Sequence, residues 1–248
     1  MRFAVISLLL LLVLLVPVWA MTAEGVTMKA QPVLNQKQES IITIAAFTAN
    51  GDMDKLQSAL NEGLDAGLTV NEIKEILVQM YAYAGFPRSL NGLGTFMSVM
   101  DKRKAKGIKD VMGKDASLIP VNLNKDDYGA KVRAQLGGLD KVPPPAKWQE
   151  FSPVIDKFLK EHLFADIFAR DVLTFQEREL ATIAALASMP GLDGPLTFHL
   201  GAAMNTGLTE NQMKAFVSVI KNRVGNKEGN GVGKLLGGVL AKRPGKQL

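Results

Sequence analysis

The sequence of 248 residues contains no cysteine. Without thiols the chain cannot form a disulfide, a CxxC redox pair, a thiolate metal site or a lipoprotein anchor. Histidine is nearly absent too, since only His162 and His199 occur, and neither lies in an HExxH or carboxylate–histidine metal motif. We therefore expect neither a zinc nor a di-iron site, and no cofactor of any kind.

Aromatic residues are sparse, at 6% of the chain, whereas 47% of the residues are hydrophobic and 21% are charged. The apolar residues are mainly Leu, Ala, Ile, Val and Met, a composition that favours helices over strands. No segment is typical of a strand. A chain of this length can bury one sizeable core or two small ones, and we expect an all-α protein.

Long apolar runs are absent except at the N-terminus. There Arg2 precedes the aliphatic run 4–16, Pro17 ends it, and segment 18–20 (Val-Trp-Ala) then offers small residues at the positions that a signal peptidase reads. This order is typical of a secretory signal peptide, so we expect cleavage and a periplasmic or secreted protein without stable membrane insertion. The alternative is an uncleaved anchor, for which the run is close to the minimum length.

The net charge is modest, at +5, and its lysines and arginines cluster at 102–109 and 221–246. Solvated helix ends and a basic tail account for such clusters, although they would also attract small anionic ligands. No nucleic-acid recognition motif is present, and a nucleic-acid partner is not expected.

The chain contains an internal repeat. Leu34–Met80 and Leu173–Ile220 share a TIAA segment, a following glycine and a Gly-Leu-Thr segment, which lies at 67–69 and at 207–209. Further on, Asn-Gly segments at 91–94 and 230–233 also match. Self-similarity over this distance indicates duplication of a helical unit.

Local signals mark the helix boundaries. Gly67 and Gly207 suit left-handed helix C-termini, and Pro87 predicts the start of a further helix that ends near Lys104. Capping-box pairs predict four helix starts, at Asn35/Gln38, Thr69/Glu72, Thr174/Glu177 and Thr209/Gln212. The predicted organisation is a signal peptide (1–20), a flexible leader (21–33), a first repeat (34–104), a linker (105–146), a second repeat (147–240) and a basic tail (241–248).

Two stretches resemble the carboxymuconolactone decarboxylase family: GLTVNEIKEILVQMYAYAGFPRSLNGL at 67–93, and RELATIAAL with LTFHLGAAMNTGLT at 178–209. The resemblance implies an all-α, AhpD-like helical bundle, here with two tandem repeats, that assembles as a homo-oligomer. It also implies either decarboxylation of a lactone or, in the alkylhydroperoxidase branch, thiol peroxidase chemistry. That branch needs C-x-x-C-x-x-x-H, but Leu192 and Pro195 occupy the cysteine positions, so cysteine-based peroxidase activity is not expected.

The two repeats have diverged in a complementary way. The first keeps the motif 83–88 but has Ala59 at the position of His199, whereas the second keeps the histidine and lacks the motif. We predict one composite site to which both repeats contribute. The alternative is that both sites have decayed.

Candidate site residues follow from this match. His199 would act as the catalytic acid that protonates a carbanion, with Glu75 or Gln79 orienting it. Arg88 would hold a substrate carboxylate through its planar guanidinium, and Tyr83 and Asn91 would line the substrate site. The structural alternatives are a packed core histidine, solvated polar residues at 75, 79 and 88, a packed aromatic at 83 and a turn at 91.

Two functions remain open from the sequence. The first is a cofactor-free decarboxylase or similar lyase acting on a small, anionic carboxylated substrate. The second is a small-molecule-binding or assembly protein that has kept the fold and lost the chemistry.

Overall fold

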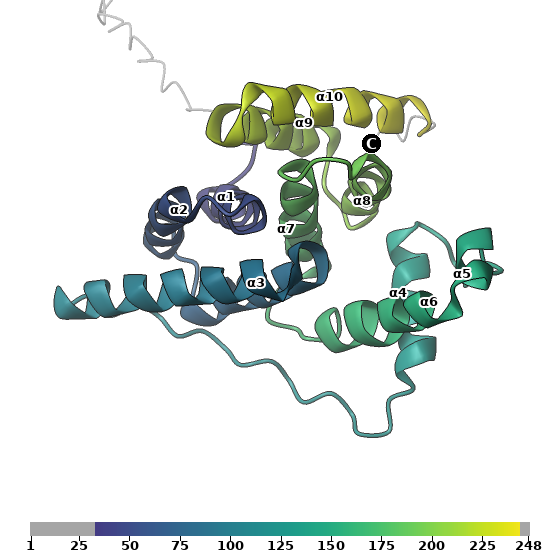
Figure 1. The fold of residues 1–248 in the computed structure, drawn as a ribbon, viewed down its shortest axis with the longest axis horizontal. Coiled ribbons are helices and arrows are strands. Elements are labelled where there is room, and N and C mark those ends of the chain that lie inside the picture. Colours follow the sequence, from purple (N-terminus) through teal and green to yellow (C-terminus); the bar gives the residue numbers. More distant parts are fainter. Residues whose placement is uncertain (1–32, 244–248) are drawn as a thin grey trace, which may run out of the picture. The chain divides into compact units, whose positions relative to one another are not determined.

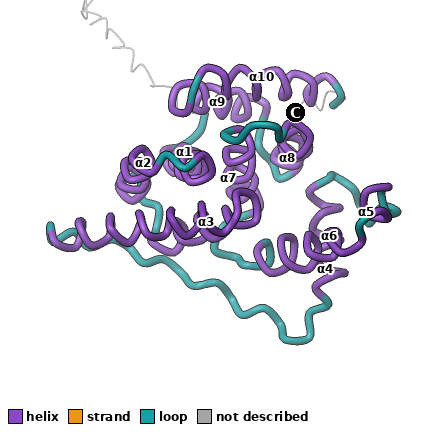
Figure 2. The backbone as a smooth tube through the Cα atoms, in the orientation of Figure 1, coloured by secondary structure: helices purple, strands orange, loops and turns teal. Residues whose placement is uncertain are grey.

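The computed structural model describes residues 33–243, and in this range the regular structure is entirely helical (Figures 1 and 2). The predicted signal peptide, all of the leader but its last residue, and the end of the basic tail lie outside the described residues. None of the described helices is long and apolar enough to cross a bilayer. The helices are α1 (Gln36–Asn50), α2 (Met53–Asp65), α3 (Val70–Ala105), α4 (Lys125–Leu136), α5 (Lys147–Phe151), α6 (Pro153–Phe158), the π-helical η1 (Leu159–Ile167), α7 (Phe175–Ala187), α8 (Asp193–Asn205), α9 (Glu210–Val219), the π-helical η2 (Ile220–Val224) and α10 (Asn226–Ala241).

The helix boundaries predicted from capping signals are confirmed. Reciprocal capping boxes open α1, α3, α7 and α9 at the four expected residue pairs. Gly67 and Gly207 adopt φ angles of 90° and 106°, where a side chain would be strained. Gly85, at φ 84° and ψ 158°, breaks α3 two residues before Pro87, so the expected further helix does begin there.

The two repeats fold alike. The helices α1, α2, α3 up to the break, and α3 after the break correspond to α7, α8, α9 and α10. Buried positions on the last helix of each repeat recur 140 residues apart, at 89, 92, 96 and 99 and at 229, 232, 236 and 239. This spacing pairs Asn91 with Gly231, so the Asn-Gly match seen in the sequence is out of register by one residue.

The repeats share one hydrophobic core. Helices α1 and α7 pack against each other, and both are buried along most of their length, over 40–49 and 178–187. Side chains from both repeats form one continuous cluster, which includes Ile41, Ile44, Leu60, Ile76, Ile183, Leu200 and Phe216. Neither repeat therefore encloses a core of its own.

The predicted linker 105–146 contains a helix that the sequence did not indicate. Helix α4 packs against η1 and contacts α8. Side chains of these three helices form a second, smaller hydrophobic cluster. The approach of η1 requires glycine at position 129, because a Cβ there would lie 1.9 Å from the carbonyl oxygen of Lys160. The weak apolar pattern of α4 explains why it was missed, since only Val132, Ala134 and Leu136 are buried apolar side chains.

A buried polar network joins the two repeats. Arg178 of α7 is fully buried and donates from Nη2 to Glu75 Oε1 at 2.8 Å and from Nη1 to Gln79 Oε1 at 2.9 Å. Gln79 donates in turn to the Arg178 carbonyl oxygen and to Thr182 Oγ1, each at 2.9 Å. Arg170 adds a second cation to Glu75 at 3.0 Å. Glu75 and Gln79 are therefore neither solvated nor on a free helix face.

We predict that Glu75→Gln lowers the free energy of unfolding by about 3–5 kcal/mol, because it leaves the buried Arg178 guanidinium without its counter-ion. Urea denaturation followed by circular dichroism measures the change. Glu72→Gln is the matched control, since glutamine can replace glutamate in a capping box. A loss for Glu75→Gln no larger than that of the control would show that the pair does not stabilise the fold.

Candidate active site

His199 forms a buried pair with Glu179. Helix α8 carries the histidine and α7 carries the carboxylate, and His199 Nδ1 lies 2.8 Å from Glu179 Oε2. The exposed fractions are 6% for His199 and 0% for Glu179. A carboxylate on Nδ1 fixes the ring orientation and leaves Nε2 as the reactive nitrogen. This Nε2 makes no hydrogen bond to any described residue.

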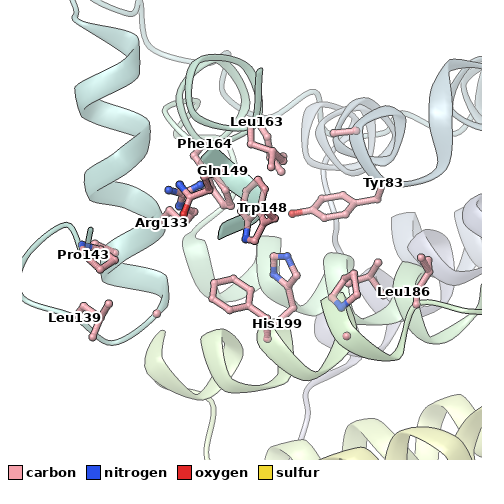
Figure 3. Close-up of a pocket in the computed structure, with 18 residues that line it drawn as sticks. Tyr83, Arg133, Leu139, Pro143, Trp148, Gln149, Leu163, Phe164, Leu186 and His199 are labelled. Carbon is pink, nitrogen blue, oxygen red and sulfur yellow. The ribbon is translucent and has the colours of Figure 1, made fainter. Parts of the chain in front are cut away.

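A cavity of about 640 Å³ lies beside His199 (Figure 3). Helices α3, α4, α5, α7, α8 and η1 contribute to its wall, and most of the wall is apolar. Its lining includes four aromatic side chains, Tyr83, Trp148, Phe164 and Phe198. Both the volume and the few polar groups are typical of a small-molecule site.

Tyr83 packs its ring against His199, with ring centroids 5.6 Å apart and an interplanar angle of 81°. Its hydroxyl oxygen is buried and has no hydrogen-bond partner among the described residues. Burial, and next the charge of Glu179, raise the pKa of Tyr83 well above its usual value. The hydroxyl therefore stays protonated and can serve as a hydrogen-bond donor.

Arg133 is the cation of the cavity wall, on the α4 side, and Figure 3 shows it across from His199 and Tyr83. Its Nη1 donates to Asp156 Oδ1 at 2.6 Å, and its guanidinium lies 5.9 Å from the centre of the Trp148 ring. Its remaining nitrogens have no partner among the described residues. They are therefore available to a ligand.

Asp156 connects the four helices that cover the cavity, α4, α5, α6 and η1, which we call the cover. Besides Arg133, it accepts hydrogen bonds from Gln149 at 2.7 Å and pairs with Lys160 at 3.2 Å. Burial acts to raise the pKa of Asp156, but the hydrogen bonds from Arg133, Gln149 and Lys160 together outweigh it, so this pKa lies below its usual value. The carboxylate thus links α4, α5, α6 and η1.

Two of the predicted site residues, His199 and Tyr83, meet at the cavity. Glu75 and Gln79 do not line it, since they belong to the buried network around Arg178. The carboxylate that contacts His199 is Glu179 instead.

The structure does not bring the predicted anchor Arg88 to His199. After the break at Gly85, Arg88 is exposed and its guanidinium lies over Gly51, where a Cβ would be 1.3 Å from Nη1. Asn91 is exposed on the same helix and also lies outside the cavity wall. The other histidine, His162, contacts Tyr81 and Asp166 and likewise lies outside the wall.

The site residues predicted from the sequence did not include Glu179, which suits the acidic first turn of a helix, or Arg133. A signal for Glu179 existed, because it adjoins Arg178 and precedes a run, 180–187, that is apolar except for Thr182. Two charges at such a position are buried with the helix, and each then requires a buried partner. Arg133 had no comparable signal, because its role depends on how the linker folds back over α8.

The chain belongs to the carboxymuconolactone decarboxylase family, whose model matches residues 18–96 and 153–223. Two separate matches confirm the tandem repeat. A similar characterised protein is 4-carboxymuconolactone decarboxylase from Acinetobacter baylyi (strain ATCC 33305 / BD413 / ADP1), 29% identical over 97 residues. The match covers 39% of this chain and 63% of that protein, less than two thirds of its length. Helices α4 and α5, which carry Arg133 and Trp148, lie between the matched segments.

We predict that protonation of the Asp156 carboxylate at low pH weakens its contacts to Arg133 and Gln149 and so loosens the cover. Because the folded pKa of Asp156 is depressed, its contribution to stability is complete above about pH 4, the usual aspartate value, and is lost as the pH falls through the folded pKa. The fluorescence emission of Trp148 as a function of pH reports the change. It is measured in a Trp19→Phe variant, which removes the other tryptophan. Asp156→Asn should abolish this transition, and an unchanged titration in that variant would contradict the assignment.

Proposed function

We propose that the protein is a cofactor-free lyase that decarboxylates a small carboxylated substrate, with His199 as the proton donor. One observation carries the proposal: a buried imidazole, held by a carboxylate at Nδ1, borders an apolar cavity of about 640 Å³ with its Nε2 unpartnered among the described residues. General acids are positioned in this way, with the second nitrogen fixed and the reactive one directed at substrate.

The reaction requires one bond to break and one proton to move. The bond between the substrate and its carboxylate breaks, carbon dioxide leaves, and the electron pair is delocalised onto an adjacent carbonyl. Protonated His199 then gives its Nε2 proton to the carbon, and solvent restores that proton. Glu179 stabilises the imidazolium before the transfer, because its carboxylate lies 2.8 Å from Nδ1.

Two further groups would assist. The neutral, unpartnered Tyr83 hydroxyl can donate a hydrogen bond to the carbonyl oxygen as negative charge develops there. Arg133 takes the anchoring role that the sequence suggested for Arg88, since its free nitrogens belong to the cavity wall. The chemistry uses no thiol, in keeping with a chain that contains no cysteine.

The cellular location and the oligomeric state of the protein are also proposals. The apolar run 4–16 and the small residues that follow it support export to the periplasm or beyond. Membership of the family supports assembly as a homo-oligomer.

We predict that His199→Asn lowers kcat by roughly 10²–10⁴-fold, the usual contribution of a general acid. Asparagine can still donate to Glu179 but cannot transfer a proton. Carbon dioxide release by the purified protein measures the change, with lactone acids that carry one carboxylate and with the dicarboxylate 4-carboxymuconolactone. Full turnover by His199→Asn would refute the assignment. Absence of turnover for every acid, with ligand-dependent thermal stabilisation retained, would favour the binding protein instead.

The two arginines make a matched test of the anchor. Arg133→Met should lower kcat/KM by roughly 10–100-fold, corresponding to a lost charge-assisted hydrogen bond, whereas Arg88→Met should have no effect. Steady-state kinetics measures both, and melting temperatures check that each variant folds. The opposite order of effects would restore the anchor predicted from the sequence.

A further inference from the structure

The cavity concentrates aromatic side chains in a protein that has few. Aromatics make up only 6% of the chain, yet Tyr83, Trp148, Phe164 and Phe198 all line this one cavity. Phe198 and Tyr83 both meet the His199 ring edge to face, with centroids 5.1 and 5.6 Å away. Flat, apolar walls of this kind favour a ligand with a flat, apolar body.

The same cavity offers little positive charge. Among the described residues Arg133 is the one arginine or lysine in its wall, and it already pairs with Asp156 at 2.6 Å. A protonated His199 would be neutralised by Glu179, at 2.8 Å. The neighbouring Lys160 does not add free charge, because it pairs with both Asp156 and Asp126, at 3.2 and 2.8 Å. One ligand carboxylate can therefore be paired at Arg133, whereas a second would lie against the apolar wall without an ionic partner, which is unfavourable.

The residues that impose these limits come largely from the cover. Trp148 and Arg133 belong to α5 and α4, between the two segments that match the family model. The His199–Glu179 pair, by contrast, lies within the second matched segment. The cover can thus set the ligand class independently of the proton-transferring pair.

We propose that the cavity binds monocarboxylates with an aromatic or similarly flat apolar body, and discriminates against dicarboxylates. The carboxylate lies against Arg133, and the ring packs among the aromatic side chains of the wall. This inference rests on the proposed function for its site and adds the class of substrate.

Isothermal titration calorimetry on the full chain tests the class with three acids. 3-Phenylpropionate has a ring and one carboxylate, propionate lacks the ring, and phenylsuccinate keeps the ring and carries a second carboxylate on its aliphatic chain. We expect 3-phenylpropionate to bind at least tenfold more tightly than either of the others. Equal or tighter binding of phenylsuccinate or propionate, or no saturable binding of any of the three, would overturn the proposal.

A matched pair of variants locates the ring. Trp148→Ala should weaken 3-phenylpropionate about three- to tenfold, whereas Phe151→Ala should not, because Phe151 is on the same helix but is 91% exposed and outside the cavity wall. Equal effects of the two variants would count against this site.

The two proposals fail in distinguishable ways. His199→Asn should abolish turnover and leave 3-phenylpropionate binding intact. If the three acids bind in the expected order but no acid is turned over, the lyase fails and the ligand class stands. If turnover depends on His199 while phenylsuccinate binds best, the lyase stands and the ligand class fails.

Discussion

The fold and the site both depend on the buried guanidinium of Arg178. It is fully buried between Glu75 and Gln79 of the other repeat, and so it fixes the rotation of α7 against α3. Burial lowers the pKa of Arg178, but an arginine remains charged in proteins, so the position requires a carboxylate partner. The next residue along α7 is Glu179, and it therefore faces His199 as a consequence of the same rotation. Thr182 and Gln79 continue the network between the two repeats.

The described residues contain one copy of this arrangement, although the helical unit is duplicated. In the opposite repeat the positions of Arg178, Glu179, Glu75, Gln79 and His199 hold Glu39, Ser40, Ala215, Val219 and Ala59. The position of Tyr83 holds Arg223, which pairs with Glu62 on the surface. Two symmetric networks would have required four buried charges at a shared core, each with its own desolvation cost. Because each repeat keeps only part of the set, one polar crossing and one site remain among the described residues.

The features predicted correctly from the sequence are those that neighbouring residues determine. Capping boxes at Asn35 and Thr174, the left-handed Gly67 and Gly207, and the break before Pro87 involve atoms within a few residues of each other. The fold class and the repeat follow from many such signals in agreement. They required no knowledge of how the helices pack.

The site was predicted less well because its contacts are distant in sequence. Glu179 reaches His199 from another helix, and Arg133 reaches the cavity only after the linker folds back over α8. Arg88 was misplaced because one backbone angle at Gly85 decides which way the following helix points. His199 and Tyr83 were found because the family match supplied the tertiary information that their neighbours lack.

The repeats and the cover contribute different parts of the candidate site. The repeats hold His199 and Glu179 rigidly, since both extend from helices packed into the main core. The cover is held by fewer contacts, chiefly the second cluster and the carboxylate of Asp156. A change in the cover can therefore alter the size and charge of the ligand without disturbing the core. Because Arg133 both binds Asp156 and faces the cavity, the proposed ligand carboxylate would contact the same side chain that holds the cover together.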